Sequence, residues 1–287
     1  MYYGMIVISV IMFGGCFTLQ DVYRSMRGSG LRISLESSFL GSTAGLIILL
    51  SLNGFSIELT PFTMIMALAA SLNRIAFTFC TFKALSVVNL SLFSLFSMLG
   101  GMMLPFLQGI LFYNEEVTVA KILCILFIAA ALFLTLTRSS KTKGTLYCIG
   151  IFVLNGMSGV ISKLFTSAPF PKAEAVDFSI MTAIFTLVLS SALLLLLFRK
   201  SVKESPLTVS ATAVGVLGGG INQVANFILI IALAHVDASV QYPMVTGGVM
   251  IVSTLICFFG KKKPSRKELL SVLLSFIGLL TLFLIPV

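Results

Sequence analysis

Residues 71–112 read SLNRIAFTFCTFKALSVVNLSLFSLFSMLGGMMLPFLQGILF, two apolar stretches separated by a short polar segment that ends at Asn89. A helix needs roughly 20 largely apolar residues to cross a hydrocarbon core about 30 Å thick. The second stretch meets this length within the quoted residues, and the first meets it when it is extended back to Phe62. The segment therefore predicts two membrane-spanning helices joined by a tight turn.

The same length criterion predicts ten spanning helices in the chain of 287 residues, and hence an all-α integral membrane protein without room for a soluble domain. The second span has the weakest pattern, because Glu36 and several hydroxyl residues dilute its start. The expected spans are Tyr2–Leu19, Leu35–Leu52, Phe62–Phe82, Leu90–Phe112, Val119–Leu136, Thr145–Leu164, Phe178–Phe198, Val209–Ala234, Ala238–Phe259 and Leu269–Pro286.

Composition supports this interpretation. The chain is 58% hydrophobic and 10% charged, with a mean hydropathy of +1.10, whereas a soluble domain carries about 25% charged residues. The net charge of +9 does not indicate a nucleic-acid partner, because the basic residues form short runs between the apolar stretches. The five cysteines form no CxxC pair, so we expect neither a metal site nor a disulfide framework.

An internal repeat divides the chain near residues 138–144 (RSSKTKG). Five spans in each half give the two halves opposite topologies in the membrane, with the substrate site near the middle of the bilayer. We predict one five-helix repeat over residues 1–137, a polar linker over 138–144 and a second repeat over 145–287. The matched positions, whose spacing falls from 149 to 147 residues, are Asn73/Asn222, Ala76/Ala225, Ala84/Ala232, Gly100/Gly247, Gly101/Gly248 and Phe112/Phe259.

The charge distribution predicts an orientation. Fifteen of the nineteen Lys and Arg residues fall on one side of the predicted topology, and the positive-inside rule places that side in the cytoplasm and both termini outside. The family resemblance described below favours the opposite orientation, with both termini inside, so the orientation of the termini stays open. The fifteen are Arg24, Arg27, Arg32, Lys83, Arg138, Lys141, Lys143, Arg199, Lys200, Lys203, Lys261, Lys262, Lys263, Arg266 and Lys267.

Arg74 is the strongest functional signal, because a charge near the centre of a spanning helix costs about 2.5–3.5 kcal/mol on insertion scales. In the functional interpretation it binds an anionic group of the substrate. In the alternative it pairs with an acidic or carbonyl group of a neighbouring helix. Other polar residues at a similar depth complete the expected substrate site, namely Asn73, Asn155, Asn222, Gln223, Asn226 and Tyr242, although interhelical hydrogen bonding would equally explain them.

Other residues suggest movement. Proline and glycine within a helix permit bending, so hinges for alternating access are expected at Gly100, Gly101, Pro105, Pro243, Gly247 and Gly248; close helix packing is the alternative. His235, in a short turn, is expected to be solvated rather than a proton relay.

The duplicated five-helix layout, together with the stretch from Lys83-Ala84-Leu85 to Leu111-Phe112-Tyr113-Asn114-Glu115-Glu116-Val117-Thr118, resembles the drug/metabolite transporter superfamily in its ten-helix EamA-like branch. Glu115 matches the family's glutamate after the fourth helix, while Lys262 stands at the related place of the second half. The resemblance implies secondary transport of small metabolites, often amino acids or related compounds, and frequently export.

We therefore expect a secondary active transporter, and not an enzyme, that moves a small polar anionic or zwitterionic metabolite by alternating access. Its expected partners are that substrate, a coupling proton or other ion, and the lipid bilayer; no cofactor, metal or nucleic acid is expected, and the chain is a monomer or a homodimer. Compact loops and the lack of a targeting segment suit the bacterial inner membrane. Alternatives are a flippase for a lipid-linked phosphate and a non-transporting scaffold or receptor.

Overall fold

The computed structural model describes residues 2–113, 118–136, 142–198, 207–233, 235–236, 238–259 and 264–284. Within these residues the chain forms ten helices and no strand. The helices are α1 (Tyr2–Arg27), α2 (Leu31–Leu52), α3 (Pro61–Leu85), α4 (Leu90–Tyr113), α5 (Val119–Leu136), α6 (Thr142–Ser167), α7 (Ala175–Phe198), α8 (Val209–Leu233), α9 (Ala238–Phe259) and α10 (Arg266–Leu284).

Several predicted spans were too short. Helix α1 continues past Leu19 to Arg27, α2 begins at Leu31 rather than Leu35, and α6 begins at Thr142, inside the expected linker. The length criterion counts only residues that suit the hydrocarbon, whereas a helix continues into the polar interface until a capping signal ends it. For α1 that signal is Gly28, whose φ of +104° is readily adopted by glycine.

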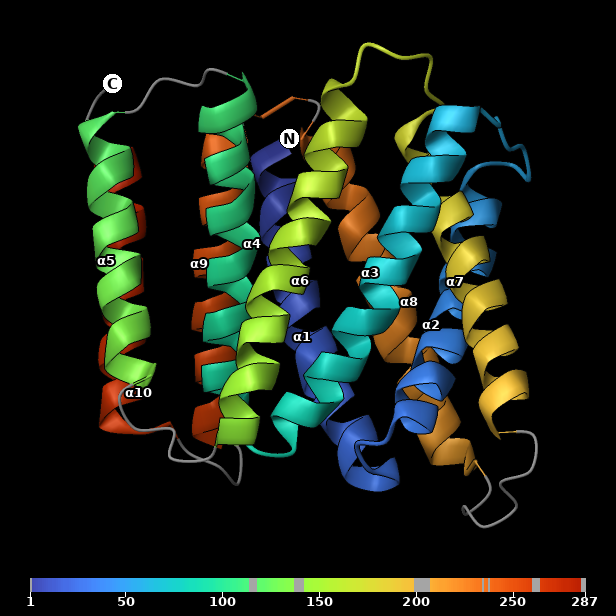
Figure 1. Cartoon of the computed structure of the whole chain (residues 1–287), viewed down its shortest axis with the longest axis horizontal. Coiled ribbons are helices and arrows are strands. Elements are labelled where there is room, and N and C mark those ends of the chain that lie inside the picture. The colour runs from blue at the N-terminus through green and yellow to red at the C-terminus, as the bar shows by residue number, and fades with distance from the viewer. Residues whose placement is uncertain are drawn as a thin grey trace.

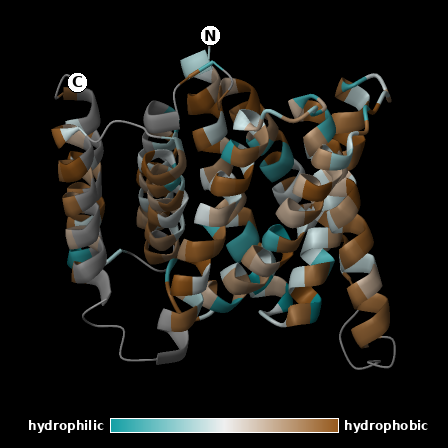
Figure 2. Cartoon of the chain, turned by 45° about the horizontal axis from the view of Figure 1, so that its top comes forward, coloured by the Kyte–Doolittle hydropathy of each residue, from teal (hydrophilic) through white to brown (hydrophobic). Residues whose placement is uncertain are grey.

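Seven of the described helices, α1–α4 and α6–α8, are long and apolar enough to cross a membrane. Large apolar side chains are exposed on the outside of the bundle, among them Leu196 at 80% and Phe112 at 77%. Figure 2 shows hydrophobic colour along the outer helices and hydrophilic residues nearer the middle of the bundle. Because apolar side chains on this scale require lipid rather than water around them, the chain is a multi-pass membrane protein.

Successive helices run in opposite directions, and α1 begins on the same side of the bundle as α10 ends (Figure 1). Helix α8 packs against α1 and α2, and α3 packs against α6 and α7. Helix α4 packs against α6 and α9, α9 packs also against α1, and α2 packs against α7. The α5–α10 pair stands at one edge, with few contacts to α4 and α9 (Figure 1).

Helices α2 and α8 approach each other through glycines. A Cβ atom placed on Gly41 of α2 would lie 2.7 Å from the Cα atom of Gly219 of α8, which is closer than real contacts allow. A Cβ atom on Gly219 would in turn collide with the backbone of Gly41. Two hydrogen atoms at these positions let the two backbones touch, which brings α8 into the centre of the bundle.

A buried ion pair joins α1 to α2 at the end of the bundle that carries many basic residues. The Glu36 carboxylate accepts hydrogen bonds from Arg27 at 2.9 Å and from Arg32 at 3.0 Å. The side chains of Glu36 and Arg27 are 8% and 5% exposed. This pair accounts for a carboxylate at the start of a spanning helix, because each of its oxygens meets a cation.

Candidate functional site

A cavity of about 190 Å³ lies in the middle of the bundle. Helices α1, α3, α4, α6, α7, α8 and α9 line it, so both halves of the chain contribute. All seven of the polar residues expected at a substrate site lie in its wall: Asn73, Arg74, Asn155, Asn222, Gln223, Asn226 and Tyr242. The structure thus gathers into one cavity residues that lie up to 169 positions apart in the sequence.

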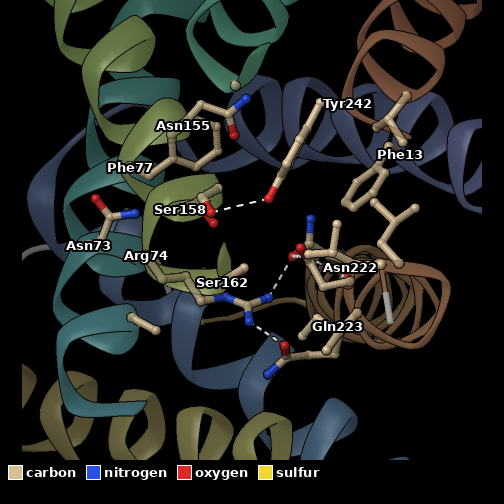
Figure 3. A pocket seen from close by; sticks show the side chains of 18 of the residues that line it. Phe13, Asn73, Arg74, Phe77, Asn155, Ser158, Ser162, Asn222, Gln223 and Tyr242 are labelled. Atoms are coloured by element: carbon tan, nitrogen blue, oxygen red, sulfur yellow. Dashed lines mark hydrogen bonds between the residues drawn. The ribbon is translucent and has the colours of Figure 1, made fainter. Parts of the chain in front are cut away.

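Arg74 reaches from the middle of α3 across the cavity wall to α8 (Figure 3). Its Nη2 atom donates a hydrogen bond to Asn222 Oδ1 at 2.6 Å, and its Nη1 atom donates to Gln223 Oε1. Among the described residues, no carboxylate forms an ion pair with Arg74. The guanidinium is therefore held by neutral amides and keeps its full positive charge beside the cavity.

Two asparagines and a tyrosine hold the α6 side of the site. Asn73 donates to the Leu154 carbonyl at 2.9 Å, and Asn155 donates to the Ser97 carbonyl at 2.6 Å. Tyr242 donates from its hydroxyl to the Gly159 carbonyl at 3.1 Å. In each case one donor of the side chain is engaged by a backbone carbonyl. Interhelical hydrogen bonding, the alternative explanation of these three residues, thus accounts for part of their contacts. The same side chains also line the cavity.

The α8 side follows helical spacing. Asn226 donates to the Asn222 carbonyl at 2.8 Å and to its Oδ1 at 3.1 Å, so residues one turn apart form one polar surface. Gln241 donates to the Leu229 carbonyl at 2.8 Å and is 2% exposed. The side-chain Nε2 of Gln223 and Oε1 of Gln241 are buried without a partner among the described residues.

Part of the cavity wall was not predicted from the sequence. Ser158 and Ser162 of α6 line it one and two turns beyond Asn155, and Ser179 and Thr182 of α7 line the opposite part. Helical spacing from Asn155 is a signal that identifies the first two, since residues at i+3 and i+7 share its face. Aromatic side chains complete the wall, namely Phe13, Phe17, Phe77 and Phe178.

Three of the four glycines expected as hinges lie at helix crossings. A Cβ atom on Gly101 would lie 2.6 Å from Asn155 Nδ2, and one on Gly100 would collide with the Phe152 carbonyl, where α4 packs on α6. A Cβ atom on Gly248 would lie 2.7 Å from Val10 Cγ1, where α9 packs on α1. Close packing therefore accounts for these three glycines. Of the other three positions expected as hinges, Pro105 lies inside α4, Pro243 lies within α9, and Gly247 is buried in α9. The hinge role stays a prediction for all six positions.

A second, smaller cavity of about 60 Å³ adjoins the first. Arg74, Phe77 and Asn222 line both. The remaining wall comes from the second half of α1, the first half of α2, and α8, with Thr78 of α3. The second cavity therefore extends from Arg74 towards the end of the bundle that carries the Arg27–Glu36 pair.

Other predicted features fall elsewhere. Glu115, Glu116 and Lys262 lie outside the described residues. His235 is exposed in the turn before α9, as expected, and its ring stacks on Tyr2 with centroids 4.2 Å apart. The five cysteines are free, and the described residues hold no group of His, Cys, Asp and Glu able to bind a metal ion.

Comparison with known proteins bears on the fold alone. No family model and no curated protein matches the chain. One solved crystal structure, described only as that of a protein, matches 96% of this chain and 97% of its own chain, with a TM-score of 0.64 and 19% sequence identity. The chain therefore shares its fold over nearly its whole length with a structure determined by experiment.

Proposed function

We propose that the chain is a secondary transporter of the drug/metabolite transporter type, which moves a small polar metabolite with an anionic group by alternating access. The observation that carries this proposal is Arg74, a charged residue in the central cavity that no described carboxylate neutralises. A buried charge without a counterion is costly. A carboxylate or phosphate of the substrate would supply the missing negative charge.

The remaining wall suits the rest of such a substrate. Amide and hydroxyl groups from Asn155, Ser158 and Asn226 would hydrogen-bond its polar atoms, while the aromatic side chains would enclose its apolar part. A cavity of about 190 Å³ matches a compound of metabolite size rather than a macromolecule. We assign to this site the binding of a substrate and no chemical reaction.

Helix packing supports two inverted five-helix repeats. If α1–α5 are exchanged with α6–α10 in order, the α1–α8 contact becomes α6–α3, α2–α8 becomes α7–α3, and α4–α6 becomes α9–α1. All six of these contacts are present, and the α2–α7, α4–α9 and α5–α10 contacts transform into themselves. This pattern is the one expected of two halves related by a two-fold axis, the arrangement that many transporters use to alternate.

The proposal is tested by ligand-dependent thermal stability in detergent, followed by counterflow in proteoliposomes. A ligand that binds only the folded state adds about 2.7 kcal/mol at one hundred times its dissociation constant. Among amino acids, organic acids, nucleosides and phosphorylated metabolites, we expect one anionic or zwitterionic class to stabilise the protein. The same compound should exchange across the liposome membrane.

Arg74→Ala should abolish both effects, and Arg24→Ala is the matched control. Arg24 pairs with Asp21 at the end of α1 and lines neither cavity, so its removal deletes an arginine without touching the site. Exchange by Arg74→Ala at the wild-type rate contradicts the proposal. If soluble compounds have no effect and a lipid-linked phosphate does, the flippase alternative replaces it.

A further inference from the structure

The charged side chains in the wall of the central cavity restrict the charge of its substrate. Among the described residues that line this cavity, Arg74 is the only charged one and none is acidic. The guanidinium of Arg74 donates to the neutral amides of Asn222 and Gln223 (Figure 3). The described wall therefore carries one positive charge and no negative charge.

The buried carboxylates of the bundle serve other contacts. In the part of the chain that the structure describes, two carboxylates are buried, those of Glu36 and Asp177, and neither lines the central cavity. Glu36 binds two arginines at the end of the bundle. Asp177 stands in the first turn of α7 and accepts a hydrogen bond from Asn53 Nδ2 at 3.0 Å. Neither carboxylate is placed to neutralise a cationic group of a substrate.

An amino acid does not match this distribution of charge. If Arg74 binds the carboxylate, the ammonium group lies one carbon atom further on, where the guanidinium repels it. The described wall offers that ammonium group neutral oxygens alone, and burial of a cation without a counterion is costly. A second carboxylate or a doubly charged phosphate meets the converse difficulty, because one guanidinium neutralises one negative charge. The wall thus suits a substrate with a single negative charge.

The uncharged part of the wall suits oxygen and apolar groups. Ser158, which is exposed, and Ser162 line the cavity from α6, the helix that packs against α3 beside Arg74 (Figure 3). A serine hydroxyl donates or accepts a hydrogen bond, so it can pair with a hydroxyl or an oxo group without a charge. The rings of Phe13 and Phe77 provide apolar surface in the same cavity.

We propose that the substrate is a monocarboxylate without an amino group, of the 2-hydroxy or 2-oxo acid class and with an apolar side chain. Its carboxylate binds Arg74, its second oxygen function binds the α6 hydroxyl groups, and its side chain packs against the phenylalanine rings. This assignment rests on the proposed transport function and narrows its substrate from anionic or zwitterionic compounds to monoanions.

Pairs of compounds that differ in one group test the assignment. Lactate and the hydroxy analogues of leucine and phenylalanine are each compared with the corresponding amino acid, and lactate is also compared with malate, which adds a second carboxylate. The melting temperature of the full-length protein in detergent is recorded at neutral pH and constant ionic strength. We expect at least one hydroxy acid to raise it saturably, at a half-maximal concentration at least tenfold below that of its amino acid, and malate to have less effect than lactate. Arg74→Ala should abolish the rise.

A variant that adds a carboxylate to the wall tests the role of charge. We expect Ser158→Asp to lower at least tenfold the ratio of half-maximal concentrations, amino acid over hydroxy acid, because it supplies a counterion for the ammonium group. Ser158→Asn has a side chain of the same size without the charge and should keep the wild-type ratio. An unchanged ratio in Ser158→Asp, or an equal fall in both variants, would overturn the assignment.

The two proposals fail in different ways. If an amino acid or malate binds as tightly as the hydroxy acids and Arg74→Ala abolishes that binding, the monoanion assignment is wrong and the proposed transport function stands. If no hydroxy acid changes the melting temperature, the assignment is likewise wrong, and the wider set of metabolites decides the transport function.

Discussion

Arg74 of α3 and Gln223 of α8 are hydrogen-bonded to each other although they stand 149 residues apart in the chain. This is also the spacing between Asn73 and Asn222, so the two partners occupy equivalent positions of the predicted repeats. Two equivalent residues of a two-fold arrangement meet only near the axis. The bond therefore lies where the predicted axis would cross the cavity wall, and the presence of Arg74 in one half and Gln223 in the other makes that point asymmetric.

The Arg74–Gln223 bond should be measurable as a coupling energy. We expect Gln223→Leu to destabilise the protein by about 1–3 kcal/mol, because it removes an acceptor from a buried charge. With Arg74→Met the charge itself is gone, so the double variant should lose less than the sum of the single losses. Unfolding in mixed detergent micelles provides the free energies. Additive losses would show that the two side chains do not interact in the folded protein.

Glu36 should matter far more to stability than Asp21. Glu36→Gln leaves Arg27 and Arg32 with one amide oxygen in place of a carboxylate, and we expect a loss of about 3 kcal/mol. Asp21→Asn is the control at the same end of the bundle. Its pair with Arg24 is 36% exposed on the Asp21 side, so a loss under about 1 kcal/mol is expected. Comparable losses of stability in the two variants would contradict a buried cluster of Glu36 with Arg27 and Arg32.

The contact between α2 and α8 should not tolerate a methyl group. Gly219→Ala drives its Cβ atom into the backbone of Gly41, and overpacking of this kind costs about 1–3 kcal/mol. Gly15→Ala is the matched control, since no atom lies within 4 Å of a Cβ placed there. Alanine also favours a helix over glycine by about 1 kcal/mol, so Gly15→Ala should be neutral or stabilising. The comparison fails if the two variants unfold alike.

Filling the larger cavity should remove ligand binding and spare the fold. Ser158 faces the cavity and is exposed there, so Ser158→Leu occupies space without displacing a packed neighbour. We expect wild-type melting without ligand and loss of the ligand-dependent shift. Ser190→Ala, a change in α7 away from both cavities, should keep that shift. Retention of the shift by Ser158→Leu would place the ligand elsewhere.

Much of the fold could be predicted from the sequence, because the bilayer imposes a length and an apolar composition on every spanning helix. The helix ends could not, because capping and interfacial residues decide them; α1 runs eight residues beyond its predicted end at Leu19 to Arg27. The start of α2 is poor in apolar residues for a structural reason that the sequence pattern does not show. Glu36, Ser38 and Ser42 serve the buried ion pair and the second cavity rather than the lipid.

The cavity was predictable where polar residues are rare in membrane helices. Arg74, Asn222 and Gln223 stand out for this reason and lie together in the wall. Serine and threonine do not stand out, because their hydroxyl groups can donate a hydrogen bond to a backbone carbonyl of their own helix. Thr182 does so to the Phe178 carbonyl at 2.8 Å. Phenylalanine packs equally well against lipid and against a ligand, so the sequence does not distinguish Phe13 in the cavity wall from a ring that faces lipid.

Arg74 lines both cavities, so a single guanidinium serves two compartments. Any occupant that draws this charge to one side weakens the attraction on the other. By thermodynamic reciprocity, two ligands that both bind this guanidinium from opposite sides would each lower the affinity for the other by the same factor. The shared guanidinium would therefore link two such ligands by negative cooperativity that originates at one side chain.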